Sequence, residues 1–380
     1  MALVRSELGD GVLAAEGRAL CERVIREGGM DALYALAERH DVSAVLTAAL
    51  VDSRLIDHKS EEYLRRVDSE ELAFFRAKRM DHAIGEIEKT LSDAKIRHTP
   101  LKGALMRPLY PSPIMRLSAD VDVLVSEDDL DAATVALKST LGYKADGVKG
   151  YHDVSLYSPE GIHLELHYNL LENEPSLDAV LSEALEHISE ADGYTVPLTP
   201  EFFAFHLVTH LTYHFMNGGC GIKPFCDLYI YRKNNAIDDS RLLSLIERAA
   251  LSEFYKNINS LIAVWLEGRE HTDLTLAMED HVLHNAFGGS VSRGIVRRQA
   301  KVGKFRYILS RIFMPYSQLK IRYPVVGKFP PLLPIFEVVR WTSLLFGGGK
   351  RARRELRDSL SVSDGQARRM LDFLASVGLD

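Results

Sequence analysis

The chain has 380 residues and a formal net charge of −7, with 46% hydrophobic and 26% charged residues. This balance is ordinary for a globular protein and excludes wholesale disorder, a collagen and a coiled coil. Three cysteines are too few for a disulfide scaffold, and Cys220 and Cys226 have no second pair for a zinc site, so we expect a reducing, cytoplasmic compartment. The most apolar stretch, 330–346, contains Glu337 and Arg340, so no membrane span is predicted.

The first 95 residues are predicted to form a helical region. Apolar side chains recur there at spacings of three and four, which is the period of an amphipathic helix. A long helix is expected over about 69–94, because Ser69-Glu70-Glu71 places acidic residues at the positive end of the helix dipole.

Residues 96–198 alternate between strand-like and helix-like segments, which predicts a mixed sheet. Strands are predicted over 96–101 and 119–125, and a hairpin is predicted from 152–157 and 162–167, joined by a turn that contains Pro159 and Gly161. Between the second strand and the hairpin, Ser126-Glu127-Asp128-Asp129 caps a helix that Gly142 ends.

From residue 199 the pattern is helical again, since Thr199-Pro200-Glu201 is a good helix start. The chain therefore divides into a helical region 1–95, a core 96–198 and a C-terminal helical domain 199–380. The predicted fold class is α+β, with a small mixed β-sheet between two helical parts.

Asp120 and Asp122 are the sharpest chemical feature of the sequence. Side chains two apart in a strand point to one face, while Val121, Val123 and Val125 point to the other. Two adjacent carboxylates repel each other unless a cation bridges them, and their oxygen atoms suit Mg²⁺ or Mn²⁺. A solvated edge strand is the alternative interpretation. If the pair is catalytic, Asp122→Asn is expected to abolish activity and, by relieving repulsion, to raise the metal-free melting temperature slightly.

Glu165 strengthens the catalytic interpretation. It shares a strand face with His163 and His167, opposite the apolar Leu164 and Leu166. If both apolar faces pack on one core, Glu165 joins the two aspartates, and three carboxylates on one sheet face can hold two divalent ions about 3.5–4 Å apart.

The step from strand to helix at Lys102-Gly103 is suited to bind phosphate. The glycine permits close backbone approach, the helix N-terminus attracts anions and Lys102 adds a point charge. Arg116, four residues before Asp120, is suited to a bidentate phosphate contact or is an ordinary surface arginine.

These residues carry a resemblance. Leu101-Lys102-Gly103, Arg116 and the strand Asp120-Val121-Asp122-Val123-Leu124-Val125 resemble the uncharacterised nucleotidyltransferase family of the DNA polymerase β superfamily. The likeness spans roughly 80–345. It departs from the wider superfamily at Lys102, where Gly-Gly or Gly-Ser is usual, and at Glu165, where Asp is more frequent.

The resemblance implies a nucleotidyltransferase core that takes a nucleoside triphosphate. It implies that Asp120, Asp122 and Glu165 are the catalytic metal ligands. It further implies substrate contacts at Lys102, Gly103, Arg116, His167, His210 and Asp227. His206, His210 and His214 follow one face of a helix, but the outer two lie about 12 Å apart, so polar lining of the cleft is favoured over a shared metal.

The predicted activity is metal-dependent transfer of a nucleoside monophosphate to a hydroxyl, with release of pyrophosphate. The acceptor, whether a sugar, a metabolite or a protein, stays open. Two alternatives are a non-catalytic module of the same fold, which binds a nucleotide or a partner, and a protein-modifying enzyme that acts on a toxin-like partner.

The segment 293–354 holds 15 Lys or Arg and one acidic residue. A solvated face, a nucleic-acid surface and docking on an anionic membrane all fit this composition. We expect weak, peripheral contact with the inner face of a membrane, and no sequence-specific binding of nucleic acid.

Overall fold

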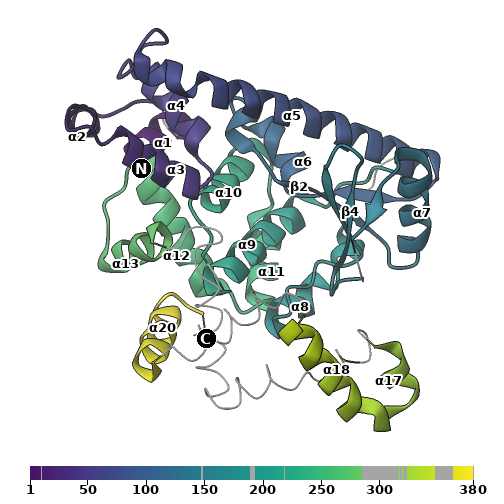
Figure 1. The fold of residues 1–380 in the computed structure, drawn as a ribbon. Helices are drawn as coiled ribbons and strands as arrows, with labels where there is room; N and C mark the ends of the chain where they lie inside the picture. Colours follow the sequence, from purple (N-terminus) through teal and green to yellow (C-terminus); the bar gives the residue numbers. More distant parts are fainter. Residues whose placement is uncertain are drawn as a thin grey trace. The chain divides into compact units, whose positions relative to one another are not determined.

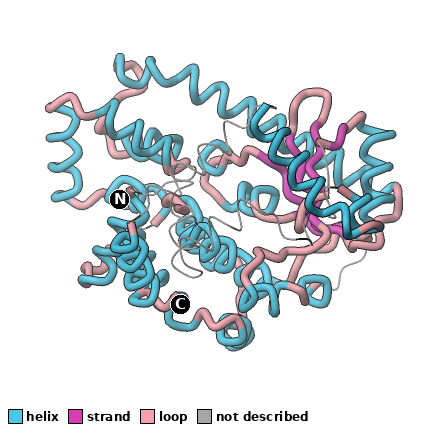
Figure 2. The backbone as a smooth tube through the Cα atoms, turned by 60° about the horizontal axis from the view of Figure 1, so that its bottom comes forward, coloured by secondary structure: helices cyan, strands magenta, loops and turns pink. Residues whose placement is uncertain are grey.

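The computed structural model describes residues 1–9, 11–146, 149–188, 193–217, 219–284, 316, 319, 323–346 and 363–379. The chain divides into two compact units. The first comprises Met1–Tyr213 and Cys220–Phe287, and the second comprises His214–Gly219 and Gly288–Asp380. Figure 2 shows the strands gathered into one small sheet in an otherwise helical chain.

The first unit begins with five helices, as predicted for the first 95 residues. They are α1 (Ala2–Leu8), α2 (Ala15–Arg26), α3 (Met30–Arg39), α4 (Ser43–Asp52) and α5 (Glu61–Asp93). Helix α5 begins eight residues earlier than expected, because Ser-Glu-Glu occurs twice in this stretch. The first copy is the true start: the hydroxyl of Ser60 accepts a hydrogen bond from the backbone N–H of Tyr63 at 3.1 Å.

Five strands form one mixed sheet in the order β1-β2-β5-β4-β3. The strands are β1 (His98–Pro100), β2 (Asp120–Val125), β3 (Lys144–Ala145), β4 (Asp153–Tyr157) and β5 (His163–His167). Strands β2 and β5 are parallel, whereas the other pairs are antiparallel, including the predicted hairpin of β4 and β5. The two-residue, exposed β3 was not predicted, because it has no alternation to reveal it.

One face of the sheet is apolar and packs on two helices, α5 and α7 (Leu130–Leu141), which also contact each other (Figure 1). Helix α7 ends at Gly142 in the left-handed conformation, as expected. The core at this face is formed by side chains of both strands and both helices, namely Val121, Val123, Val125, Leu164, Leu166, Ile87, Leu91, Leu130 and Leu137. The valines of β2 therefore face the core, and its two aspartates face the other way.

Short elements connect β1 to β2: α6 (Gly103–Met106) and the 3-10 turns η1 (Arg107–Leu109) and η2 (Pro113–Arg116). After the sheet come α8 (Pro175–Leu181) and η3 (Ala184–His187). The remaining helices of this part are α9 (Pro200–Asn217), α10 (Lys223–Asn234), α11 (Asp239–Arg248), α12 (Ser252–Ile262), the π-helical turn η4 (Ala263–Glu267) and α13 (Asp273–Leu283).

The second unit contains α17 (Pro324–Lys328), η5 (Pro330–Leu332), α18 (Leu333–Phe346) and α20 (Asp364–Ser376). Most of the basic segment 293–354 lies outside the described residues. Within the described part of the chain, no helix combines the length and the apolar character that a bilayer span requires.

Candidate active site

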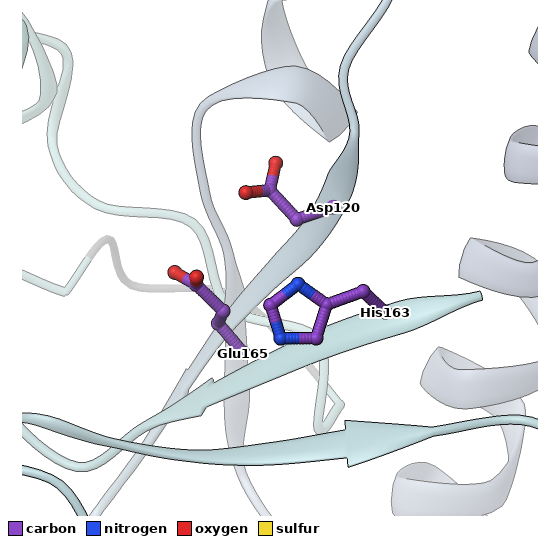
Figure 3. A group of neighbouring side chains, drawn as sticks. All are labelled: Asp120, His163 and Glu165. Carbon is purple, nitrogen blue, oxygen red and sulfur yellow. The ribbon is translucent and has the colours of Figure 1, made fainter. Parts of the chain in front are cut away.

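The polar face of the sheet gathers acidic and histidine side chains from its two central strands. The parallel register of β2 and β5 places Asp120 beside His163 and Asp122 beside Glu165. One ligand atom from each of Asp120, His163 and Glu165 lies within 4.8 Å of the others, and Asp122, Glu165 and His167 form a second such group. Figure 3 shows the side chains of Asp120, His163 and Glu165 pointing to the same side of the strands. The expected carboxylates are therefore together, with Glu165 common to both groups.

The chemistry of these donors fits a hard divalent cation. Carboxylate oxygens are the ligands that Mg²⁺ and Mn²⁺ prefer, and an imidazole is compatible with Mn²⁺. The backbone of the half-buried Asp120 pairs with His163 in the sheet, but its side chain forms no ion pair or hydrogen bond with any described residue. Burial and the neighbouring carboxylates of Asp122 and Glu165 raise the pKa of Asp120. A cation placed here would relieve that repulsion.

Asp122 has a different environment, because two donors already contact it. The ammonium of Lys102 donates to Oδ1 of Asp122 at 2.9 Å, and Nε2 of His167 lies 3.1 Å from the same oxygen. Asp122 is 3% exposed. Burial would raise the pKa of Asp122, but Lys102 and His167 outweigh burial and hold it well below its usual value. Asp122 is therefore a stably ionised carboxylate.

His167 also lies 3.5 Å from Oε2 of Glu165 through the same nitrogen. Hydrogen bonding from His167 is the main cause that lowers the pKa of Glu165. Burial disfavours the charged imidazole of His167, but its hydrogen bonds to Asp122 and Glu165 prevail and raise its pKa. His167 thus contacts one carboxylate on each central strand, Asp122 on β2 and Glu165 on β5.

The Lys102-Gly103 step differs from the expected phosphate loop. Helix α6 spans four residues, so its dipole is small, and the side chain of Lys102 is directed to Asp122. Lys102 has φ +36°, which is rare for a residue with a side chain. A Cβ at Gly103 would lie 2.7 Å from Oγ of Ser118, so the glycine here permits a close approach to a side chain.

Arg116 and Asp227 are brought together, a pairing that no local sequence pattern indicated. Nε of Arg116 donates to both carboxylate oxygens of Asp227, at 2.7 and 3.0 Å, and the hydroxyl of Tyr110 donates to Oδ1 at 2.7 Å. All three side chains are buried. Arg116 and Asp227 form an internal ion pair that joins η2 to α10. Tyr110 completes this buried group, and no role was predicted for it from the sequence.

Helix α9 contributes two histidines with lowered pKa values. Nδ1 of His210 lies 3.2 Å from Oε1 of Glu172, another residue that the sequence did not single out. His206 is 2% exposed, and neither of its ring nitrogens has a hydrogen-bond partner among the described residues. Burial first, and then the charge of Lys102, holds the pKa values of both histidines well below normal. Both rings are therefore neutral and lie near the charges of the site.

The fold and the site define an α+β protein with a carboxylate cluster on the polar face of a small mixed sheet. Over residues 27–267, the chain matches the family described as "Uncharacterised nucleotidyltransferase", and it belongs to that family. The resemblance seen in the motifs is thereby confirmed, although the match covers 27–267 and not the expected 80–345. A general capacity for nucleotidyl transfer follows from this membership.

Two further comparisons add little. The chain is similar to the solution structure of the antibiotic-resistance factor ANT(2'')-Ia, at 12% identity, covering 55% of this chain and 99% of that one. The TM-score of this similarity is 0.28. No curated protein matched the chain.

Proposed function

We propose that the protein is a metal-dependent nucleotidyltransferase, which moves a nucleoside monophosphate from a nucleoside triphosphate to a hydroxyl acceptor and releases pyrophosphate. The observation that supports this most directly is the convergence of Asp120, Asp122 and Glu165 from two adjacent parallel strands. Family membership supports the same conclusion.

In this proposal the three carboxylates hold Mg²⁺ or Mn²⁺. When bound, the cation neutralises triphosphate charge and polarises the α-phosphate. The acceptor hydroxyl attacks the α-phosphorus and forms a new P–O bond, while the bond to the β-phosphate oxygen breaks. Glu165, which retains 26% side-chain exposure and has a lowered pKa, takes the hydroxyl proton.

The substrate-binding roles are assigned from what each side chain already contacts. Lys102 supplies positive charge beside Asp122, and Gly103, which has no side chain, leaves room for the close approach of Ser118. His167 holds Asp122 and Glu165 in position. His210, whose Nδ1 lies 3.2 Å from Oε1 of Glu172, would contact the substrate from α9, and Arg116 and Asp227 would support the site through their buried pair.

A second candidate is a non-catalytic nucleotide-binding module of the same fold. The observation in its favour is the ammonium of Lys102 on Asp122, a carboxylate that a catalytic cation would use. Retention of three acidic residues within reach of one another favours the enzyme.

The test is a screen of the four nucleoside triphosphates, each labelled at the α-phosphate, with Mg²⁺ or Mn²⁺ and a cell extract as the source of acceptor. A labelled product that the wild-type protein forms and the Asp120→Asn variant does not form would support the enzyme. Tight nucleotide binding without any labelled product would support the module instead.

A further inference from the structure

The two ligand groups of the site differ in the positive charge that the chain itself provides. At Asp120, His163 and Glu165 no Lys or Arg of the described residues makes an ion pair. At Asp122, by contrast, the ammonium of Lys102 lies 2.9 Å from Oδ1. Two positions that look equivalent in the sequence are thus unequal in the structure.

The backbone fixes Lys102 beside Asp122. The N–H of Leu101 donates to the backbone carbonyl of Asp122 at 3.1 Å, so the residue before Lys102 is anchored to the strand that carries the carboxylate. On the other side, Gly103 is in close approach to Ser118. Between these anchors Lys102 adopts φ +36°, a conformation that costs a residue with a side chain about 1–3 kcal/mol. Glycine would avoid this strain, so the lysine stands here at a local conformational cost.

Charge balance supports a role for this lysine. Lys102 supplies at Asp122 the positive charge that a second divalent cation would otherwise bring. A second divalent cation at Asp122 would have to displace an ammonium that is 18% exposed and hydrogen-bonded to a carboxylate that is 3% exposed. An ammonium is a compact point charge with three donors, and it suits an oxygen-lined position.

We propose that the ammonium of Lys102 permanently occupies one of the two cation positions of this site. The protein then binds a single divalent ion, at Asp120, His163 and Glu165. This inference rests on the proposed function and changes one part of it: Asp122 would hold Lys102 in place of a divalent ion, so transfer would depend on one divalent ion and one lysine.

The test is the stoichiometry of Mn²⁺ binding to the full chain, measured by electron paramagnetic resonance of the free ion during a titration. The wild-type protein is expected to bind one Mn²⁺ at the site. Lys102→Met is expected to bind two, because Asp122, Glu165 and His167 become available to a second ion. The matched control is Lys89→Met, which removes a lysine that is 69% exposed and paired with Asp93, and it is expected to bind one.

Lys102→Gly provides a second variant in case the methionine variant does not fold, since glycine accepts φ +36° without strain. It too is expected to bind two ions. Two ions in the wild-type protein, or one ion in a folded Lys102 variant, would overturn the inference and leave the proposed function standing. No bound ion in the wild-type protein would overturn both.

Discussion

The substitution Asp122→Asn tests the electrostatic account of the site through stability as well as activity. It keeps the shape of the side chain and removes its charge, so the ammonium of Lys102 and the imidazole of His167 lose their shared anionic partner. Removing one partner of a buried ion pair costs about 3–5 kcal/mol. Because Lys102 keeps 18% exposure and the asparagine still offers an amide oxygen, we expect the lower limit, about 3 kcal/mol.

This loss is large enough to measure by thermal unfolding. The unfolding entropy is about 2.1 cal/mol/K per residue, or about 0.8 kcal/mol/K for the 380 residues, so a loss of about 3 kcal/mol in Asp122→Asn should lower the melting temperature by roughly 4 °C. The assay is calorimetry or circular dichroism of the metal-free protein. Nucleotidyl transfer should be lost as well.

Asp120→Asn is the matched control. Asp120 has no cationic partner among the described residues, and the raised pKa of its carboxyl means that the ionised form destabilises the fold at neutral pH. Neutralising it should leave the melting temperature unchanged or slightly higher, although transfer is lost. The reasoning would be refuted by an Asp122→Asn protein as stable as the wild type, or by equal destabilisation in both variants.

Three other predictions concern the same unit. Glu165→Gln should lower kcat by at least about 100-fold with the fold intact, because the proton acceptor is removed, and unchanged steady-state kinetics would contradict that role. Gly103→Ala should destabilise the protein by about 1–3 kcal/mol in urea unfolding, because its Cβ would lie 2.7 Å from Oγ of Ser118, and an unchanged unfolding midpoint would contradict this. His206 is neutral when folded, so wild-type stability should fall as the pH drops below the ordinary value of 6.5, by up to about 1.4 kcal/mol per unit from this residue. His206→Leu should flatten the pH profile between pH 5 and 7.5, and an unchanged slope would contradict this account.

The sequence was sufficient to predict which face of the sheet carries the acids. Alternation in 120–125 and 163–167 separates apolar from acidic side chains with a period of two, and this period depends only on local geometry. The hairpin followed in the same way from its turn residues. The start of α5 was placed at the second Ser-Glu-Glu, because both copies satisfy the same capping rule.

The contacts of the site depend on tertiary structure, so the sequence could not supply them. Arg116 and Asp227 are 111 residues apart, and neither has a local pattern that pairs it with the other. The direction of the Lys102 side chain is set by a φ of +36°, which residue identity does not indicate. Sequence spacing alone therefore suggested two repelling aspartates, and a slight stabilisation from Asp122→Asn. Because Lys102 contacts Asp122, Asp122→Asn is now expected to lower the stability of the protein. The slight stabilisation that the sequence suggested is expected only for Asp120→Asn.

The position of the label after reaction is the most direct test of nucleotidyl transfer. Two parallel reactions would contain Mn²⁺ and the cell extract that supplies the acceptor. In one the nucleoside triphosphate is labelled at the α-phosphate, and in the other at the γ-phosphate. We expect the α label in the acceptor product and the γ label in pyrophosphate. The Asp120→Asn variant is expected to form neither labelled product. A γ label in the acceptor product would mean phosphoryl transfer, and would contradict the central claim.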